Sequence, residues 1–151
     1  MERNYADFVE KFALDTNTIY KNTYWTWSVR PIPTTLGASV LSLNRPAERF
    51  SAVTPEEAQA LSGVIGLIEA TLGCAFSPEK FNYLMLMMVD LHVHFHILPR
   101  YSQTVAFCQL EWIDDKWPGP PELGRYEGRA TPDILGAVRD ELMSKIPSQS
   151  T

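Results

Sequence analysis

The alternation of apolar and polar residues predicts where the strands lie. A period of two residues is typical of a strand with one buried face. We expect strands in five stretches, the first of which holds two short strands: 17–30, 38–44, 80–88, 92–99 and 102–111. Only Val89, Asp90 and Leu91 remain between the third and fourth stretches, which predicts a tight antiparallel hairpin there.

Helical spacing is clearest after residue 54. Thr54 is a natural N-cap, Pro55 takes the first helical position, and Glu57 completes a capping box. Gly73 is a typical C-terminal stop. The apolar positions of this helix recur every three or four residues and are expected to face the core: Leu61, Val64, Ile65 and Ile68.

Two further helices are expected near the chain ends. The stretch 5–13 has weak helical spacing, with apolar residues at Phe8 and Phe12. A loop over 116–129, rich in Pro and Gly, precedes a last helix that Thr131 and the following Pro and Asp open. The apolar stripe of this last helix is Ile134, Leu135, Val138 and Leu142. The order of strands, helix, strands and tail helix predicts an α+β fold with a mostly antiparallel sheet, one main helix and a C-terminal helix.

Length and composition describe a globular chain. The 151 residues predict a single domain, 1–151, and the apolar share of 45% fits a packed core. A net charge of −5 argues against a nucleic-acid partner, although a local site can still bind a small anion. Cys74 and Cys108 have no metal-binding spacing, and we expect reduced, partly buried thiols. We expect neither a signal peptide nor a membrane span, and hence a cytoplasmic protein without a membrane partner.

All three histidines of the chain occupy alternate positions of one stretch, at His92, His94 and His96. Alternation places them on one side of a strand, with neighbours about 6–7 Å apart at the backbone. The residues between them, Val93 and Phe95, are apolar and point to the other side, which we expect to be the core.

Three interpretations of this row are open. A solvated strand face can hold histidines that have no role. A zinc site can take two ligands from His-x-His on a strand, with Asp90 on the same side as a further ligand. A neutral imidazole can attack phosphorus if an acceptor holds its other nitrogen and flanking donors stabilise the phosphoryl oxygens. A central histidine with a histidine on each side supplies the layout that this third interpretation needs.

The stretch 92–98 resembles the signature of the histidine-triad (HIT) nucleotide hydrolases and transferases. The signature reads His-φ-His-φ-His-φ-φ, where φ is apolar, and the chain has His-Val-His-Phe-His-Ile-Leu. A second stretch, 37–61, resembles the strand, the RP-x-ERF turn and the helix start of the fragile-histidine-triad branch, the dinucleoside polyphosphate hydrolases. The resemblance covers a core of about residues 17–105, and the C-terminal extension, about 111–151 and ending in a helix, has no counterpart.

This resemblance implies a HIT-like α+β fold, commonly in a homodimer. It also implies a substrate of the type nucleoside-phosphate-X, such as a dinucleoside polyphosphate or a nucleoside phosphoramidate. His94 would attack the α-phosphorus, and water would hydrolyse the nucleotidyl-histidine intermediate. His92 and His96 would hold its orientation and contact phosphate oxygens. No metal or other cofactor is built into the triad, although Mg²⁺ often accompanies a polyphosphate substrate.

Two features depart from the family pattern. Most members have a further histidine in a Gly-His strand, where this chain has Ala38. The family loop before the triad ends in Gln and Ser or Thr, which bind phosphate; by offset they fall on Met88 and Val89, and a methionine cannot donate a hydrogen bond. Either Asp90 takes an acid–base role and contacts the substrate, or the chain is a non-catalytic nucleotide-binding module. A plain turn residue at Asp90 is the simplest alternative.

Five more residues are candidates for the substrate site. Asn82 lies near an Asn that contacts ribose or phosphate in relatives, or it is a plain strand-edge residue. Arg100, just past the triad, either offers bidentate phosphate contacts or is simply solvated. Arg30 falls near a ribose-binding polar position of the relatives. Trp25 and Trp27 share one strand face and are either core residues or the wall of a purine pocket.

Overall fold

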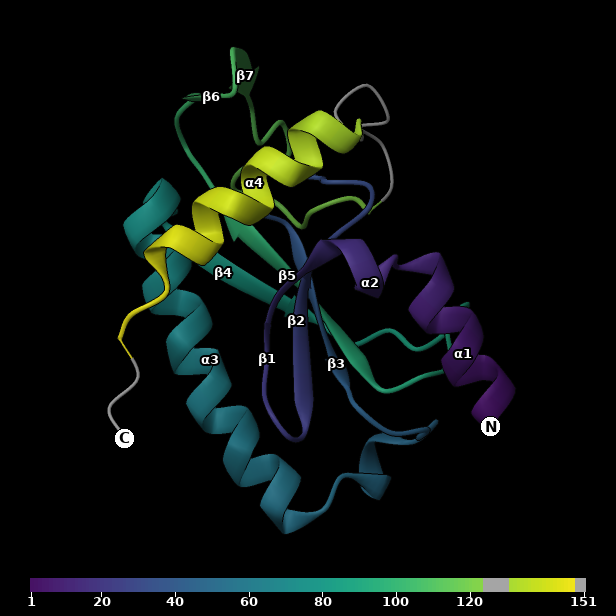
Figure 1. The fold of residues 1–151 in the computed structure, drawn as a ribbon. Coiled ribbons are helices and arrows are strands. Elements are labelled where there is room, and N and C mark those ends of the chain that lie inside the picture. The colour runs from purple at the N-terminus through teal and green to yellow at the C-terminus, as the bar shows by residue number, and fades with distance from the viewer. Residues whose placement is uncertain (124–130, 149–151) are drawn as a thin grey trace.

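The computed structural model describes residues 1–123 and 131–148, which form an α+β fold around a five-stranded sheet (Figure 1). The helices are α1 (Glu2–Lys11), α2 (Leu14–Asn17), α3 (Pro55–Phe76) and α4 (Pro132–Lys145), with a short 3-10 turn, η1 (Phe50–Ala52). The strands are β1 (Thr18–Lys21), β2 (Trp25–Val29), β3 (Ser39–Leu43), β4 (Lys80–Leu84), β5 (His94–Arg100), β6 (Val105–Phe107) and β7 (Leu110–Trp112). The predicted fold class is confirmed, including the main helix α3 and the C-terminal helix α4.

The sheet has the strand order β1-β2-β3-β5-β4, and every pair of neighbours is antiparallel. β5 therefore lies between β3 and β4. Val40 of β3 and Leu84 of β4 pair with His96 from its two sides, and Ser42 of β3 pairs with His94. β4 forms one edge of the sheet, so β5 with His94 and His96 is the next strand in from that edge.

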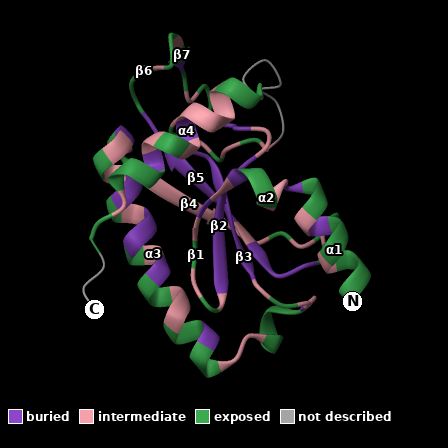
Figure 2. Ribbon diagram, in the orientation of Figure 1, coloured by how far each residue is buried: buried purple, intermediate pink, exposed green. Residues whose placement is uncertain are grey.

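Helices cover both faces of the sheet (Figure 1). α3 and α4 share one face, where Ile68 and Leu142 join Trp27 in the main core. α1 and α2 lie on the other face, where Phe8 of α1 forms a second, smaller cluster with Val40. The central strands β2 and β3 are buried along their whole length, as Figure 2 shows. The two faces thus have different helical covers.

The predicted capping box starts α3. The Thr54 hydroxyl accepts a hydrogen bond from the Glu57 amide, and the Glu57 carboxylate accepts one from the Thr54 amide. The predicted stop at Gly73 is wrong, because the helix runs on to Phe76. Ser77 then takes a left-handed conformation with φ of 52° and donates its N–H to the Gly73 carbonyl.

The predicted antiparallel pairing of β4 with β5 is confirmed, but the predicted tight turn between them is wrong. Nine residues, 85–93, connect the end of β4 to the start of β5. The reason is a change of partner at the end of this connection. Val93 donates its N–H to the Ala47 carbonyl and accepts from the Leu43 amide, so it pairs with the β3 side of the sheet rather than with β4.

The stretch 102–111 forms a hairpin of two short strands, β6 and β7, rather than one strand. Cys108 and Gln109 form its turn, and both have positive φ values, 55° and 62°. Cys108 and Cys74 are free thiols as expected, but they are exposed rather than partly buried. Of the predicted loop over 116–129, the residues up to 123 contain neither helix nor strand, and the rest lie outside the described residues.

By length and composition alone, α3 is long and apolar enough to cross a membrane. This finding corrects the expectation that no stretch comes close. In this fold the apolar side chains of α3 have a different use, because Val64, Ile68 and Leu72 are buried in the main core against the sheet.

Candidate active site

β5 and the residue pair before it place the three histidines on the sheet face that α1 covers. His94 and His96 alternate along β5. His92 precedes the strand, and its ring contacts the rings of Tyr5 and Phe8 in α1. The three side chains are buried, with exposed fractions of 1%, 1% and 6% in chain order. The row expected from alternation is therefore present, but a helix covers it.

Hydrogen bonds assign the proton positions in this row. His92 Nε2 lies 2.7 Å from the Leu43 carbonyl oxygen, and His94 Nδ1 lies 2.5 Å from the His92 carbonyl oxygen. A carbonyl oxygen only accepts, so both nitrogens donate. His96 Nδ1 lies 3.3 Å from Arg30 Nε, which only donates, so this nitrogen accepts. In a neutral ring the remaining nitrogen has the opposite role, which leaves a lone pair on His94 Nε2 and a proton on His96 Nε2.

Burial keeps the row neutral. Loss of hydration lowers the pKa of His92 and of His94 below the ordinary value. It also lowers the pKa of His96 to about 3, with the Arg30 charge as the next cause. Asp90 acts in the opposite direction on His94 and His96, but its effect is smaller than that of burial. At neutral pH the three rings are therefore uncharged, as a nucleophilic imidazole must be.

α1 covers the row with aromatic rings. The centroid of the Phe8 ring lies 4.9 Å from those of both His92 and His94. The Tyr5 ring lies 4.6 Å from His92, and the Phe12 ring lies 5.7 Å from His94. The phenylalanine rings of α1 offer no good hydrogen-bond acceptors to the polar groups that they cover. Three buried polar atoms on this sheet face have no hydrogen-bond partner: Ser28 Oγ, Ser42 Oγ and His92 Nδ1.

A cavity of about 420 Å³ opens beside His94 and His96. Its other polar lining residues are Lys11, Arg30 and Asp90. The rest of the lining is apolar: Phe12, Pro31, Ile32, Leu86, Met87, Met88, Val89 and Leu123. The volume is in the range of small-molecule sites, and two histidines, two cations and one carboxylate meet at it.

Two predicted substrate residues, Arg30 and Asp90, lie at this cavity. Arg30 is buried and donates to His96, to the Ile32 carbonyl at 2.5 Å and to the Thr34 hydroxyl at 3.2 Å. Burial lowers its pKa from the ordinary value, and Asp90 partly offsets this. Arg30 therefore brings a positive charge, fixed by three hydrogen bonds, to the edge of the histidine row.

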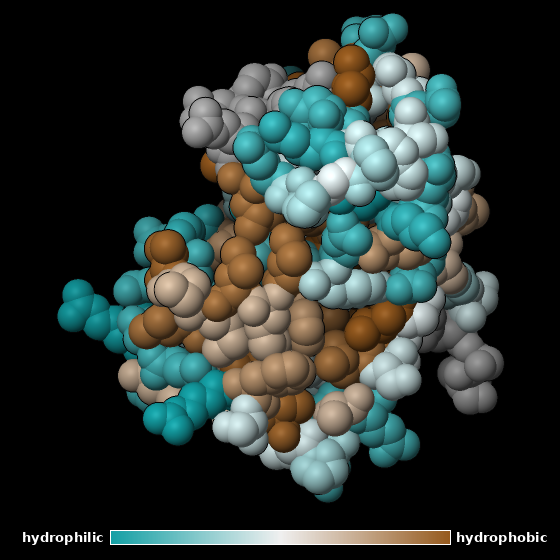
Figure 3. Space-filling model, turned by 180° about the vertical axis from the view of Figure 1, so that it is seen from behind, coloured by the Kyte–Doolittle hydropathy of each residue, from teal (hydrophilic) through white to brown (hydrophobic). Residues whose placement is uncertain are grey.

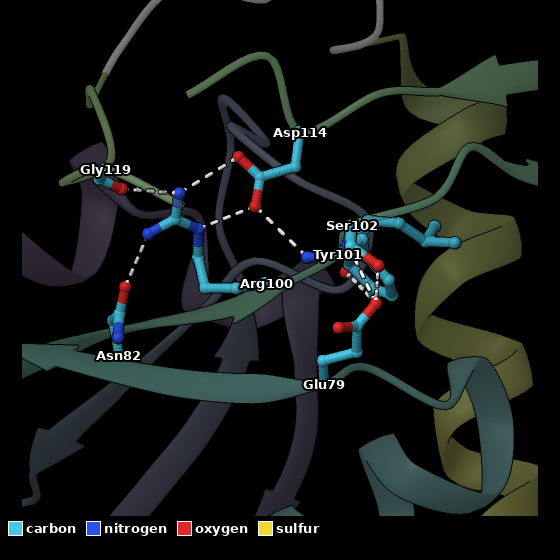
Figure 4. A network of polar contacts seen from close by, with 8 residues as sticks. Glu79, Asn82, Arg100, Tyr101, Ser102, Asp114 and Gly119 are labelled. Atoms are coloured by element: carbon cyan, nitrogen blue, oxygen red, sulfur yellow. Dashed lines mark hydrogen bonds and ion pairs between the residues drawn. The ribbon is translucent and has the colours of Figure 1, made fainter. Parts of the chain in front are cut away.

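The other two, Asn82 and Arg100, are not among the residues that line the cavity. They belong to a polar network with Asp114 and Gly119 instead (Figure 4). Alternation puts Arg100 on the histidine side of β5, but its guanidinium forms a buried ion pair with Asp114 at 2.7 Å. It also donates to the Asn82 side chain at 2.7 Å and to the Gly119 carbonyl at 2.8 Å. Asp114 in turn accepts from the Tyr101 amide. These contacts attach the C-terminal extension to the sheet.

Trp25 and Trp27 lie in the core on the opposite face of the sheet from the histidines. Both are fully buried, and the Trp25 indole donates to the Glu57 carbonyl of α3. They are therefore core residues, and they do not wall the cavity.

The structure adds Lys11 and Phe12 to the site, neither of which the sequence identified as a site residue. A signal was present, because Phe8 and Phe12 stand one helical turn apart in the stretch 5–13. That spacing predicts a helix with an apolar side, but it does not say which face of the sheet the helix covers.

The connection 85–93 borders the cavity without offering donors from its apolar part. Leu86, Met87, Met88 and Val89 line the cavity, and none of these side chains can donate a hydrogen bond to a phosphate oxygen. Met88 and Val89 are the most exposed large apolar residues of the described chain. The departure from the HIT pattern at Met88 and Val89 is thus a real difference in the chemistry at the cavity.

Among residues 1–123 and 131–148, no three His, Cys, Asp or Glu side chains come together as they would around a metal ion. Asp90 instead accepts two hydrogen bonds from Lys11, at 2.8 and 3.0 Å. The geometry therefore gives no support to the zinc interpretation of the row.

No family model and no curated protein matches the sequence. Solved structures do match it. A histidine triad protein from Sinorhizobium meliloti aligns with a TM-score of 0.71 and 19% identity, over 93% of this chain and 94% of that one. The chain has the histidine-triad fold. A Hit-like protein from Bartonella henselae, described as involved in cell-cycle regulation, aligns with a TM-score of 0.66 and 12% identity, over 94% and 95% of the two chains.

A third histidine-triad structure also aligns with the chain. It is a hypothetical histidine triad nucleotide-binding protein from Sulfolobus tokodaii, with a TM-score of 0.59 and 14% identity, over 90% of this chain and 89% of that one. Since identity is at most 19% in these three comparisons, the likeness describes the histidine-triad fold.

Proposed function

We propose that the chain is a nucleotide hydrolase or nucleotidyl transferase that acts at the α-phosphate of a nucleoside-phosphate-X substrate. The observation that carries this proposal is the hydrogen bond from His94 Nδ1 to the His92 carbonyl. It fixes the neutral tautomer whose Nε2 has a free lone pair, on a residue that lines the cavity. Dinucleoside polyphosphates, as in the fragile-histidine-triad branch, and nucleoside phosphoramidates are the two substrate classes to test first.

In the proposed mechanism, His94 Nε2 forms a bond to the α-phosphorus while the bond from phosphorus to X breaks. X leaves with the bonding electron pair and takes up a proton from solvent. The phosphorylated imidazole carries a positive charge, which the hydrogen bond from Nδ1 to the His92 carbonyl stabilises. Water then attacks the phosphorus, releases the nucleoside monophosphate and restores His94.

Two neighbours support this chemistry. His96 Nε2 carries a proton that can be donated to a phosphoryl oxygen, and Arg30 adds a positive charge beside it. The His92 carbonyl oxygen accepts a hydrogen bond from His94 Nδ1–H, and the His92 ring in turn donates from Nε2 to the Leu43 carbonyl. His92 is therefore a positioning residue, and it does not line the cavity.

The test is a panel of adenosine and guanosine dinucleoside polyphosphates and phosphoramidates, scored for release of the nucleoside monophosphate. The wild type is expected to turn over at least one class. Quenching in alkaline denaturant, which preserves a phosphorus–nitrogen bond, should trap a nucleotidyl adduct that intact-mass measurement detects. Peptide mapping should locate it on His94. An adduct on another residue, or turnover that survives in His94→Ala, would overturn the mechanism.

A second candidate is a nucleotide-binding module without turnover. Two observations favour it: α1 covers the row, and the apolar part of 85–93 supplies no donor for the leaving group. This candidate predicts nucleotide affinity in the wild type together with no product in the same panel.

The proposal includes no resident cofactor, and Mg²⁺ enters only with a polyphosphate substrate. Turnover of a phosphoramidate is therefore expected to persist after chelation with EDTA. Loss of that turnover, with recovery on adding Zn²⁺, would instead support a zinc-dependent hydrolase. The proposed partners are small nucleotides rather than nucleic acid, in keeping with the net charge of −5. The free, exposed thiols support a cytoplasmic location.

We also propose that two copies associate as a homodimer through the β4 edge. In Figure 1, β4 lies at the back of the sheet. Figure 3 shows the molecule from behind, and apolar side chains gather on that side. The exposed apolar residues include three that follow β4: Leu86, Met88 and Val89. Light scattering after gel filtration should give twice the chain mass. Met88→Asp should shift it towards the mass of one chain.

A further inference from the structure

The cavity has an unusual distribution of hydrogen-bond donors. A phosphate group at His94 needs donors around its oxygens. The apolar residues of 85–93 supply no donors. Arg30 already donates three hydrogen bonds to groups of the protein itself. Lys11, at the end of α1, has an ammonium group at the same cavity.

The contacts of Lys11 leave it available for a ligand. Its Nζ lies 2.8 Å from Asp90 Oδ1 and 3.0 Å from Oδ2, so the ammonium group faces a carboxylate in the absence of ligand. The Lys11 side chain is 54% exposed and that of Asp90 is 21% exposed, so the pair meets solvent. An exposed ion pair of this kind is weak, and a phosphate can compete with the carboxylate for it.

The packing of α1 holds Lys11 at this place. Phe8 and Phe12 of the same helix contact the His94 ring, and the Lys11 Nζ lies 5.8 Å from the centre of the Phe12 ring. The packing of α1 therefore fixes the place of Lys11 beside the histidine row.

We propose that Lys11 binds the phosphate of the nucleotide, in place of the polar loop residues that this chain lacks, and that Asp90 holds the ammonium group until the ligand arrives. This inference rests on the proposed function, because it concerns the same cavity. With Arg30 and Lys11 positive and Asp90 negative, the cavity has a net positive charge, which suits a singly charged phosphodiester. The positively charged group that binds the phosphate thus comes from the N-terminal helix α1, far from the triad in sequence.

The experiment compares the affinities of AMP and adenosine by calorimetry, since their ratio isolates the contribution of the phosphate. Lys11→Met is expected to weaken AMP binding about tenfold, as for loss of one charged hydrogen bond in a partly exposed site, and to leave adenosine binding unchanged. Lys11→Arg should retain most of the AMP affinity. Arg3→Met, an exposed change on the same helix, is the matched control and should bind both ligands as the wild type does.

Asp90→Asn separates phosphate binding from a purely structural latch. If Lys11 binds the phosphate, removing its competitor should strengthen AMP binding about two- to fivefold. The gain should be smaller in a chain that also carries Lys11→Met, because there the change only removes the repulsion between Asp90 and the phosphate. A latch alone would weaken the binding of both ligands when either residue is changed, with no further loss when both are changed, and that result would overturn the inference.

The outcomes distinguish this inference from the proposed function. If the wild type binds AMP better than adenosine and Lys11→Met keeps that preference, only the role of Lys11 is wrong. If the phosphate preference depends on Lys11 but no substrate is turned over, the Lys11 inference stands and the hydrolase proposal fails. If the wild type binds neither ligand, both fail.

Discussion

The helices on the two faces of the sheet pack against it in different ways. On one face, α3 begins with a capping box and packs Ile68 and Leu72 against fully buried aromatic and aliphatic residues. On the other, α1 has no side-chain cap and lays Phe8 and Phe12 over the histidine row. The first face is mainly apolar, although Trp27 Nε1 in its core has no hydrogen-bond partner, whereas the second places apolar rings over a row of buried polar groups.

This difference indicates a division of tasks. Burying a polar atom without a partner costs about 1–3 kcal/mol, and Ser28 Oγ, Ser42 Oγ and His92 Nδ1 are such atoms on the α1 face. A face built only for stability would have apolar residues at these positions. We infer that the α3 face provides most of the stability, while the α1 face provides the chemistry. Four predictions test this comparison, in order of decreasing effect.

The largest effect is expected for His94→Ala. It removes the nucleophile of the proposed mechanism, so turnover should fall by at least about a thousandfold. The free energy of unfolding, measured with urea, should change far less than a core truncation would change it. Full activity in this variant would contradict the inference that the α1 face provides the chemistry.

Leu72→Ala tests the stability half. Leu72 is fully buried on the α3 face, and its truncation should lower the free energy of unfolding by about 2–5 kcal/mol. Turnover per folded molecule should stay close to that of the wild type. Met143→Ala on α4, at a half-exposed position, is the control and should change stability by about 0.5 kcal/mol or less. Equal losses in the two variants would contradict the assignment of the core.

Phe8→Ala should cost less than its burial suggests. A buried Phe→Ala change typically costs about 3–5 kcal/mol, but water that reaches the unpartnered atoms beneath Phe8 should reduce this to about 2 kcal/mol. The same change should speed the reaction of diethyl pyrocarbonate with histidine. That signal is specific, because the chain has no histidine outside the row. A full-sized loss without faster modification would mean that α1 is as firmly packed as α3.

The smallest effect concerns pH. The pKa of His96 is lowered to about 3 in the folded chain, so below its ordinary value of 6.5 the unfolded chain binds a proton that the folded chain does not. Stability should therefore be highest above pH 6.5 and should fall as the pH decreases towards 3. Between pH 6 and pH 5, His96→Gln should reduce the slope of unfolding free energy against pH by up to about 1.4 kcal/mol per unit. An unchanged slope would show that this ring is protonated in the folded chain.

Local patterns predicted much of the fold because their causes are local. The capping box at Thr54 and the start of α4 after Thr131 depend on side chains within one helical turn, and both were predicted correctly. The end of α3 and the length of the 85–93 connection were not. These depend on contacts such as that of Val93 with Ala47, which no local pattern contains.

The candidate site, too, was predicted in part by a local pattern and in part decided by distant contacts. Alternation alone determined that His92, His94 and His96 share one side, since successive residues of an extended chain point in opposite directions. It said nothing about which groups would meet them there. Asp114 pairs with Arg100 only because the C-terminal extension returns to the sheet, so a residue beside the triad became a structural contact.

The sequence by itself therefore determined the histidine row, its strand and the class of fold. Only the tertiary structure decided that α1 covers the row and brings Lys11 to Asp90. The physical reason is range. The period of a strand acts between neighbouring residues, whereas Lys11 and Asp90 are 79 positions apart and meet only when the two faces of the sheet receive their helices.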